Sequence, residues 1–194
     1  IQKFNKDGMY ISGFGTKGSG PGEFDMPWGI TVTGEGDILV VDWHNDRVQK
    51  LAADGEFIME FGSSGSGDGE FKRPAGIEID HHGDIYVADR GNNRVQQFAP
   101  DGRYVDKFIG DATLSKSGET YVRANPAVLR NREMANTEQQ KRFRGPAALR
   151  FDDQGRMYVP DFGSHRIQVY KKQAYPLTPE EIAPVPNHPT LYTV

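Results

Sequence analysis

Three aspartate–arginine pairs are the residues of this sequence whose types and spacing first suggest chemistry. In each pair the Asp precedes the Arg by five positions: Asp42 with Arg47, Asp89 with Arg94, and Asp161 with Arg166. A carboxylate beside a guanidinium can take part in acid–base chemistry or simply form a charge-assisted hydrogen bond. An active site needs such a pair once, whereas these pairs recur in every copy of a repeated segment. We therefore interpret them as structural braces for the loop that separates the two residues.

Residues that break the repeat are better candidates for binding. Trp43 and His44 stand where the second copy has Arg90 and Gly91, and Phe162 and His165 occupy related positions in the third copy. With Trp28, these side chains can line an aromatic, partly polar pocket near the centre of the fold. The alternative is that the aromatic rings cover edges of the fold and the histidines face water. The expected binding residues on this face are Trp28, Trp43, His44, Arg90, Phe162 and His165.

The elements that must position these residues belong to a repeat of 47 residues, the spacing of Pro27 and Pro74. Alternating apolar residues and turn dipeptides predict four short strands in the first full copy, at residues 28–33, 37–42, 47–52 and 57–62. Asp54-Gly55 is a strong hairpin signal between the last two strands. Four antiparallel strands in a repeat of this length predict one blade of an all-β propeller.

Three registered motifs, at residues 74–77, 83–89 and 90–96, resemble the NHL repeat family. The resemblance covers residues 1–110 and 145–172, and it implies a closed ring, usually of six blades. Six repeats of this length need about 280 residues, so we expect the missing blades to come from upstream chain or, as the less favoured alternative, from a second copy. The expected division is the end of a blade at 1–24, full blades at 25–71 and 72–144, the start of a blade at 145–172, and a proline-rich extended tail at 173–194.

Some relatives of this repeat are enzymes, so a metal site needs separate consideration. The peptidyl-hydroxyglycine amidating lyase is similar to the repeat and carries a histidine-ligated zinc, its histidines following the Pro that opens some inner strands. The matching residues here are Trp28, Ala75 and Ala147, none of which can bind zinc. Glu78 is the one inner-strand residue suited to a metal, and His81 and His82 are expected to face water. No cofactor is predicted; zinc or calcium belongs to the alternative hypothesis of a metal-dependent lyase or lactonase.

Residues 111–144 contain an insertion, because Pro74 and Pro146 are 72 residues apart instead of 47. The segment has a net charge of +3 and predicts a short helix within residues 126–141. A loop of this length is usually functional or disordered, and here it can act as a lid or a docking arm. Its candidate binding residues are Arg130, Arg132, Arg142 and Arg144. They are also the argument for RNA binding, which some tripartite-motif proteins perform with NHL propellers, although a solvated mixed-charge helix explains the charge equally well.

The overall composition favours an interaction module over a nucleic-acid binder. The chain of 194 residues has a net charge of −4, whereas phosphate binding needs a basic surface. It contains no Cys, which excludes disulfides and thiolate chemistry within these residues, and no apolar run long enough to span a bilayer. The compartment stays open, with an extracellular or periplasmic setting favoured over the cytoplasm. We expect a non-catalytic scaffold propeller with a protein partner, while a small-molecule ligand stays an alternative.

Overall fold

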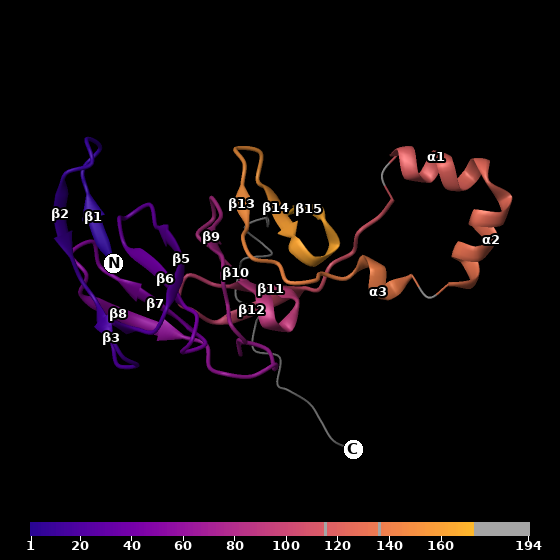
Figure 1. Ribbon diagram of the computed structural model, residues 1–194. Helices are drawn as coiled ribbons and strands as arrows, with labels where there is room; N and C mark the ends of the chain where they lie inside the picture. Colours follow the sequence, from indigo (N-terminus) through magenta and orange to yellow (C-terminus); the bar gives the residue numbers. More distant parts are fainter. Residues whose placement is uncertain (115, 136, 173–194) are drawn as a thin grey trace, which may run out of the picture.

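The computed structural model describes residues 1–114, 116–135 and 137–172, and the predicted tail at 173–194 lies outside the described residues. Two four-stranded antiparallel sheets form its centre (Figure 1). The first contains β5 (Pro27–Val32), β6 (Ile38–Asp42), β7 (Arg47–Leu51) and β8 (Phe57–Phe61). The second contains β9 (Ile77–Ile79), β10 (Ile85–Asp89), β11 (Arg94–Phe98) and β12 (Tyr104–Phe108). The strands of the first sheet begin and end within one residue of the predicted ranges, so the blade prediction is confirmed.

Smaller sheets flank these two blades. A hairpin of β1 (Gln2–Phe4) and β2 (Tyr10–Gly13) precedes them, and β13 (Arg150–Phe151), β14 (Arg156–Asp161) and β15 (Arg166–Lys171) follow in that order. The link between β2 and β5 holds a short parallel pair, β3 (Thr16–Lys17) and β4 (Glu23–Phe24). The described strands form an arc of blades and not a closed ring.

The apolar core lies between blades, because each of the two four-stranded sheets packs apolar side chains on both of its faces. Leu39, Val41 and Val48 of the first blade pack against Ile77 and neighbouring residues of the second. An equivalent cluster joins the second blade to β13–β15. Central strands with both faces covered need near-continuous apolar residues, and every residue of β6 and β10 is buried. Burying such surface is the main favourable contribution to folding.

The loops after the second strand of each blade share one backbone feature. Asp46, Asn93 and His165 occupy equivalent positions with φ of 52°, 55° and 51°. Asn, Asp and His adopt this left-handed conformation more readily than the other residues that carry a side chain. In the second and third copies the residue ends a single 3₁₀ turn, η1 (Arg90–Asn92) or η2 (Phe162–Ser164). His165 therefore has a local backbone role in addition to any role in binding.

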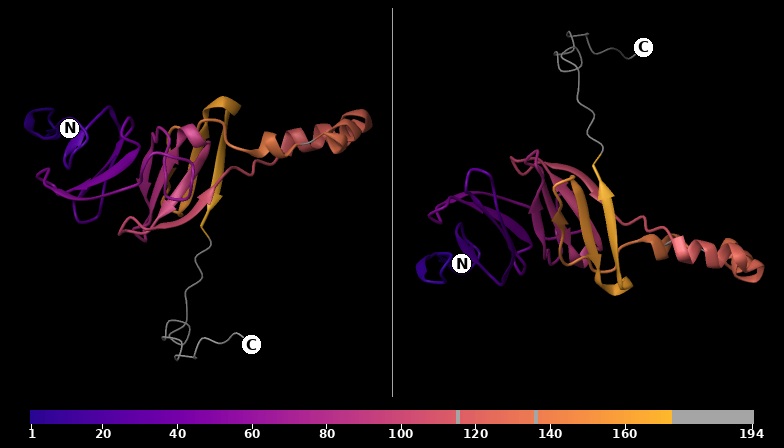
Figure 2. Two further views of the ribbon diagram at one scale, coloured as in Figure 1. Left: turned by 90° about the horizontal axis from the view of Figure 1, so that it is seen from below. Right: turned by 90° about the horizontal axis from the view of Figure 1, so that it is seen from above.

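The insertion forms an arm of three helices, α1 (Lys116–Ala124), α2 (Pro126–Met134) and α3 (Glu138–Lys141). Figures 1 and 2 show the arm projecting away from the sheets in all three views. The prediction of one short helix within 126–141 was incomplete, since two helices occupy that range and α1 precedes them. Gly118, Thr120 and Val122 have low helix propensity, which is why α1 is not predicted from the sequence. None of the helices in the described residues is long and apolar enough to cross a bilayer.

Close approach of the inner strands requires Gly76. A Cβ at this position would lie 2.7 Å from the Cα of Ala148 in the next blade. We expect Gly76→Ala to lower the free energy of unfolding by about 1–3 kcal/mol, because the two backbones must separate. Urea denaturation followed by circular dichroism measures this loss. Gly34→Ala is the matched control, since a Cβ there meets nothing within 4 Å; equal losses for both variants would contradict the explanation.

Candidate interaction face

The three aspartate–arginine pairs lie at the same place in each blade and are largely buried. The arginine Nε is 3.1 Å from the aspartate Oδ2 in the first pair, 2.8 Å in the second and 2.9 Å in the third. The other carboxylate oxygen accepts a backbone N–H from the segment that enters the blade: Asp25 at 2.8 Å, Lys72 at 2.8 Å and Arg144 at 2.6 Å. Burial raises the pKa of Asp89, against the opposing hydrogen bonds from Lys72, Asn92 and Arg94.

The remaining arginine donors bind the link from the preceding blade. Arg94 Nη2 donates to the carbonyl oxygens of Gly67 at 2.7 Å and Glu70 at 2.8 Å. Gln96, two residues further along β11, donates to the same Glu70 carbonyl at 2.7 Å. We call this arrangement of Asp, Arg and Gln the clasp. The first clasp is Asp42, Arg47 and Gln49, the second is Asp89, Arg94 and Gln96, and the third is Asp161, Arg166 and Gln168. Its donors and acceptors are used to hold backbone, so it offers no free group for catalysis.

The third clasp holds the base of the helical arm. Arg166 donates to the carbonyl oxygens of Gln140 at 2.6 Å and Arg142 at 2.7 Å. Where the arm begins, the N–H of Asp111 donates to Gln168 Oε1 at 3.1 Å. Phe143, at the end of the arm, is buried in the cluster between blades. Both ends of the insertion are therefore fixed to the blade, and the helices extend from that fixed base.

Three aromatic side chains gather on the face that carries the loops after each second strand. Trp28 and Trp43 have ring centroids 5.9 Å apart, and His44 stacks on Trp43 at 4.5 Å. The guanidinium of Arg73 lies over the Trp43 ring, 5.2 Å from its centroid. Trp28 is 59% exposed, so this group presents apolar surface and a cation to solvent. We call Trp28, Trp43, His44 and Arg73 the aromatic cluster.

Backbone hydrogen bonds and a contact between His44 and Asp25 hold the aromatic cluster in place. The N–H of Trp43 donates to Met26 at 3.3 Å, and that of His44 donates to Asp25 at 3.1 Å. His44 Nδ1 also lies 3.3 Å from a carboxylate oxygen of Asp25. Equivalent positions in the next two copies carry Ala75, Arg90 and Gly91, then Ala147, Phe162 and Gly163. The aromatic cluster thus occurs in the first of these three copies of the repeat only.

Sequence analysis missed Arg73. It precedes Pro74 and has a φ of 50°, and Met26 and Gly145 at the equivalent positions also have positive φ values, of 57° and 70°. The carboxylate of Asp46 fixes it by accepting its N–H at 2.6 Å. A non-glycine residue with a left-handed backbone is uncommon, but a sequence does not display φ. Its contact with Trp43 depends on how two blades meet.

The other predicted binding residues lie elsewhere. Phe162 and His165 line a separate groove of about 380 Å³ together with Ala147 and Ala148, and Phe162 is 72% exposed. Arg90 lies against Gly145. None of the ring contacts found in the described residues joins Phe162 or His165 to the tryptophans. The expected pocket of five side chains is therefore divided between two places.

The basic residues of the arm differ in how far they are engaged. Arg142 lies 3.7 Å from a carboxylate oxygen of Glu138, and Arg130 Nε donates to the carbonyl of Pro126 at 3.3 Å. Arg132 is half-buried and Arg144 is exposed. Arg144 is tied by its backbone to the third clasp.

Glu78, the candidate metal ligand, is already engaged by its neighbours. Thr31 donates to Glu78 Oε1 at 3.0 Å, and Arg150 forms an ion pair with Oε2. These residues come from the innermost strands of three successive blades. In residues 1–114, 116–135 and 137–172, no group of three His, Asp or Glu side chains could share a metal ion.

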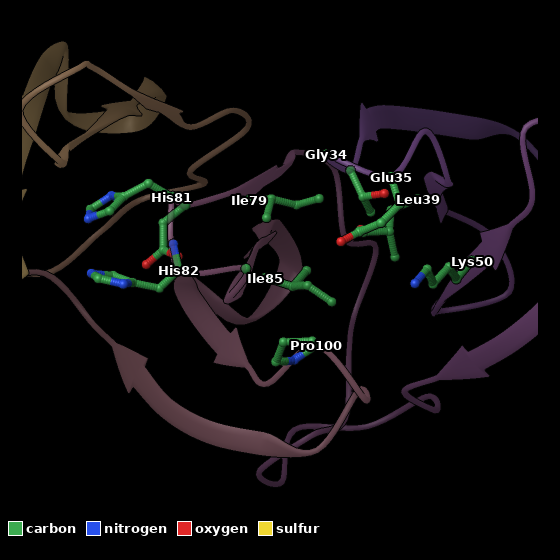
Figure 3. A pocket seen from close by; sticks show the side chains of 12 residues that line it. Gly34, Glu35, Leu39, Lys50, Ile79, His81, His82, Ile85 and Pro100 are labelled. Carbon is green, nitrogen blue, oxygen red and sulfur yellow. The ribbon is translucent and has the colours of Figure 1, made fainter. Parts of the chain in front are cut away.

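A cavity of about 450 Å³ lies between the first two blades on the opposite face. Figure 3 shows Ile79, Ile85 and Pro100 in its wall, with the rings of His81 and His82 pointing away from these apolar side chains. Lys50 also lines it, but its Nζ is 2.8 Å from Asp37. The charge of Lys50 is thus balanced within the protein.

Asp80, beside this cavity, is buried and forms a charged network. Tyr86 donates to its Oδ2 at 3.2 Å, and Lys172 Nζ lies 2.8 Å from the same oxygen and 2.6 Å from Asp84. Burial acts to raise the pKa of Asp80, but the Lys172 hydrogen bond and the N–H groups of His82 and Asp84 outweigh it and lower the pKa below its ordinary value. Burial and the charge of Asp80 raise the pKa of Tyr86.

Removing the third clasp should release the arm. Arg166→Ala leaves the carboxylate of Asp161 buried without its cation, so we expect a loss of about 2–4 kcal/mol of stability. Hydrogen exchange of residues 140–144 should become faster than in the wild type. Arg156→Ala is the control, because Arg156 makes a half-buried ion pair with Asp152 at the start of β14 and does not contact the arm. Unchanged exchange in Arg166→Ala would contradict the anchoring role.

Stability should depend on pH through Asp80. A carboxyl with a lowered pKa in the folded state stabilises the fold above its ordinary pKa, and this contribution is lost as the pH falls through the lowered value. Lys172→Met should therefore destabilise the protein most near neutral pH and least in acid, and it should raise the pKa of Asp80 in a carbon-13 NMR titration. Lys171→Met, at an exposed neighbour, is the control. A destabilisation independent of pH would refute this prediction.

Comparisons with known proteins agree with this architecture. Residues 24–51 and 71–98 each match the family model of the NHL repeat. A stretch of 42 residues is 43% identical to the E3 ubiquitin-protein ligase TRIM71 of Rattus norvegicus and covers 22% of this chain and 5% of the ligase.

Solved structures show the same fold at low sequence identity. A protein of unknown function from Bacteroides thetaiotaomicron is 20% identical, with a TM-score of 0.57 over 88% of this chain and 41% of that chain. Virginiamycin B lyase from Staphylococcus aureus is 14% identical, with a TM-score of 0.51 over 88% and 47%. The chain spans less than half the length of either protein. The chain therefore contains two NHL repeats, at residues 24–51 and 71–98, within an arc of β-propeller blades.

Proposed function

We propose that this propeller is a non-catalytic interaction module that binds another protein through its loop face. The observation that carries the proposal is the aromatic cluster. Tryptophan and arginine are the residues most enriched at the energetic centres of protein interfaces, and here they lie together on an exposed face. A repeat protein has no architectural need for this group, since the junction between the second blade and β13–β15 forms without it.

The charge around the aromatic cluster supports an acidic partner. Lys72, Arg73, Arg90 and Arg144 come from the same set of loops and links. The nearby carboxylates are engaged: Asp25 pairs with His44, and Asp46 accepts hydrogen bonds from Ser64 and Arg73. A partner segment with an apolar side chain for Trp28 and carboxylates for the surrounding cations fits this face. Complementary charge of this kind increases the rate and specificity of association.

The helical arm offers a second contact for a protein partner. Tyr121 is 61% exposed and Met134 is 88% exposed, which gives the arm apolar side chains at its surface. Several of its cations are paired within the arm, Arg123 with Glu119 at 2.5 Å and Lys141 with Glu138 at 2.9 Å. These pairs reduce the positive charge available to RNA phosphates and favour a protein partner.

The lyase hypothesis has weaker support. Similarity to virginiamycin B lyase is at the level of the fold, and the matched part of the ubiquitin ligase is too short to transfer its activity. Glu78 is neutralised by Arg150, so a metal would have to displace an ion pair in order to use it. Zinc or calcium belongs only to this hypothesis.

Replacing both tryptophans tests the proposed function. We expect Trp28→Ala with Trp43→Ala to weaken partner binding by about tenfold or more, because it removes the apolar centre of the interface. Proteins retained from the source extract by the wild type and the variant are compared by quantitative mass spectrometry, and a purified partner is then measured by calorimetry. Ile58→Ala, at an exposed residue of β8, is the control.

Two results would contradict the proposal. One is a retained partner whose affinity is the same for the wild type and the double variant. The other is stoichiometric zinc or calcium in the purified full-length protein, which would favour the enzyme hypothesis. Elemental analysis of the same preparation measures the metal.

A further inference from the structure

The cavity of about 450 Å³ between the first two blades is walled by complete blades on both sides. Its lining residues fall within residues 33–100, and they belong to the two four-stranded sheets and to the turns that connect their strands. Protein interiors are close-packed and contain few voids larger than a water molecule. A cavity of this size between two packed sheets therefore needs a specific cause.

The next junction, between the second blade and β13–β15, shows how the same place is filled. The ring of Tyr86 on β10 packs against that of Phe151 on β13, with their centroids 4.9 Å apart. The hydroxyl of Tyr86 donates to Asp80 Oδ2 at 3.2 Å, and Lys172 Nζ lies 2.8 Å from the same oxygen. Two aromatic rings and a lysine thus occupy this crevice.

Smaller residues stand at the equivalent positions of the first junction. The repeat aligns Leu39 with Tyr86, Ile79 with Phe151, Pro100 with Lys172, and Gly34 with His81. Each smaller residue of these pairs lines the cavity. Leu39 packs between the first and second blades as Tyr86 packs between the second blade and β13–β15. The cavity is therefore the space that an aromatic ring and its neighbours fill at the next junction.

The inner wall of the cavity suits an aromatic ring. Leu39, Ile79 and Ile85 supply aliphatic side chains, and Pro100 lies beside them (Figure 3). Cavities lined by aliphatic side chains take up molecules of the size of benzene. A free aromatic ring can thus replace the contacts that a tyrosine ring makes at the next junction.

One polar residue of the wall is placed to bind a hydroxyl group on such a ring. Thr33 lines the cavity and stands at the position of Asp80, which accepts the hydroxyl of Tyr86 at the next junction. Thr33 Oγ1 accepts the N–H of Asp37 at 3.1 Å. A hydroxyl group has one donor and two acceptor sites, so Thr33 can form a further hydrogen bond.

We propose that this cavity binds a small monocyclic phenol, whose ring takes the place that Tyr86 fills at the next junction. The ring binds between the aliphatic side chains, and the hydroxyl group binds at Thr33. A volume of about 450 Å³ lies within the range of small-molecule pockets. This site is on the face opposite the aromatic cluster and does not rest on the proposed function.

A titration with 4-methylphenol, which is the side chain of tyrosine as a free molecule, tests the site. The full chain carries carbon-13 in its Leu and Ile methyl groups, and their chemical shifts are followed by NMR. We expect saturable shifts of Leu39, Ile79 and Ile85, with a dissociation constant of about 1 mM or lower for a ligand of this size. Shifts confined to other methyl groups, or the absence of saturable shifts, would overturn the proposal. A segment of the protein's own chain that filled the cavity would give the second result.

Variants that fill the cavity test it from both walls. Leu39→Tyr introduces the residue found at this position in the other two copies, Tyr86 and Tyr158. It should weaken binding by about tenfold or more without lowering the melting temperature, because the new ring fills an existing space. Ile79→Phe fills the cavity from the second blade and should have the same effect on binding. Ile58→Phe, which adds a ring at an exposed residue of β8, is the matched control and should bind as the wild type does.

Three further results decide the proposal. Wild-type affinity in a folded Leu39→Tyr or Ile79→Phe variant overturns it, and the second variant decides if the first does not fold. The Trp28→Ala with Trp43→Ala variant should bind 4-methylphenol as the wild type does, and a loss of binding there would place the ligand on the loop face instead. Toluene should bind at least about threefold more weakly than 4-methylphenol, because it cannot form the hydrogen bond; equal affinity would contradict the assignment of a phenol.

Discussion

The buried clasp between an aspartate and an arginine is the interaction on which the rest of this structure depends. The Asp binds the backbone of the segment that enters its blade, and the Arg and Gln bind the link that arrives from the preceding blade. Removing one member would leave a buried charge or several carbonyl groups without a partner, which costs far more than a surface ion pair. Blades of modest size are joined in this way with apolar clusters between them, and each clasp fixes where the next loop emerges.

This constraint also explains how irregular segments are tolerated. The link before the third copy is extended by a helical arm, but the residues at its two ends make the same hydrogen bonds as the shorter links. An insertion that begins and ends inside the clasp leaves the blades undisturbed. The loop between the Asp and the Arg of each clasp is freer to vary, and the aromatic cluster, which includes Trp43 and His44 of the first such loop, is one variation of this kind. Function in repeat folds commonly resides in loops of this kind.

The residues that build the blades and the residues proposed to bind a partner are therefore different residues of the chain. Charged residues that recur in each copy are buried and engaged, whereas those that occur once, such as Arg73, face solvent beside aromatic rings.

Local patterns of the sequence predict the blades, because strand alternation and turn dipeptides such as Asp54-Gly55 repeat in register. The sequence also indicated that the Asp and Arg pairs are structural, and it located the arm, although not its first helix. Only the tertiary structure decided which side chains meet. Thr31 reaches Glu78 across 47 residues, Arg150 reaches it across 72, and Lys172 reaches Asp80 across 92. Such contacts, like that of Arg73 with Trp43, depend on how neighbouring blades are rotated and packed, which no local pattern of residues encodes.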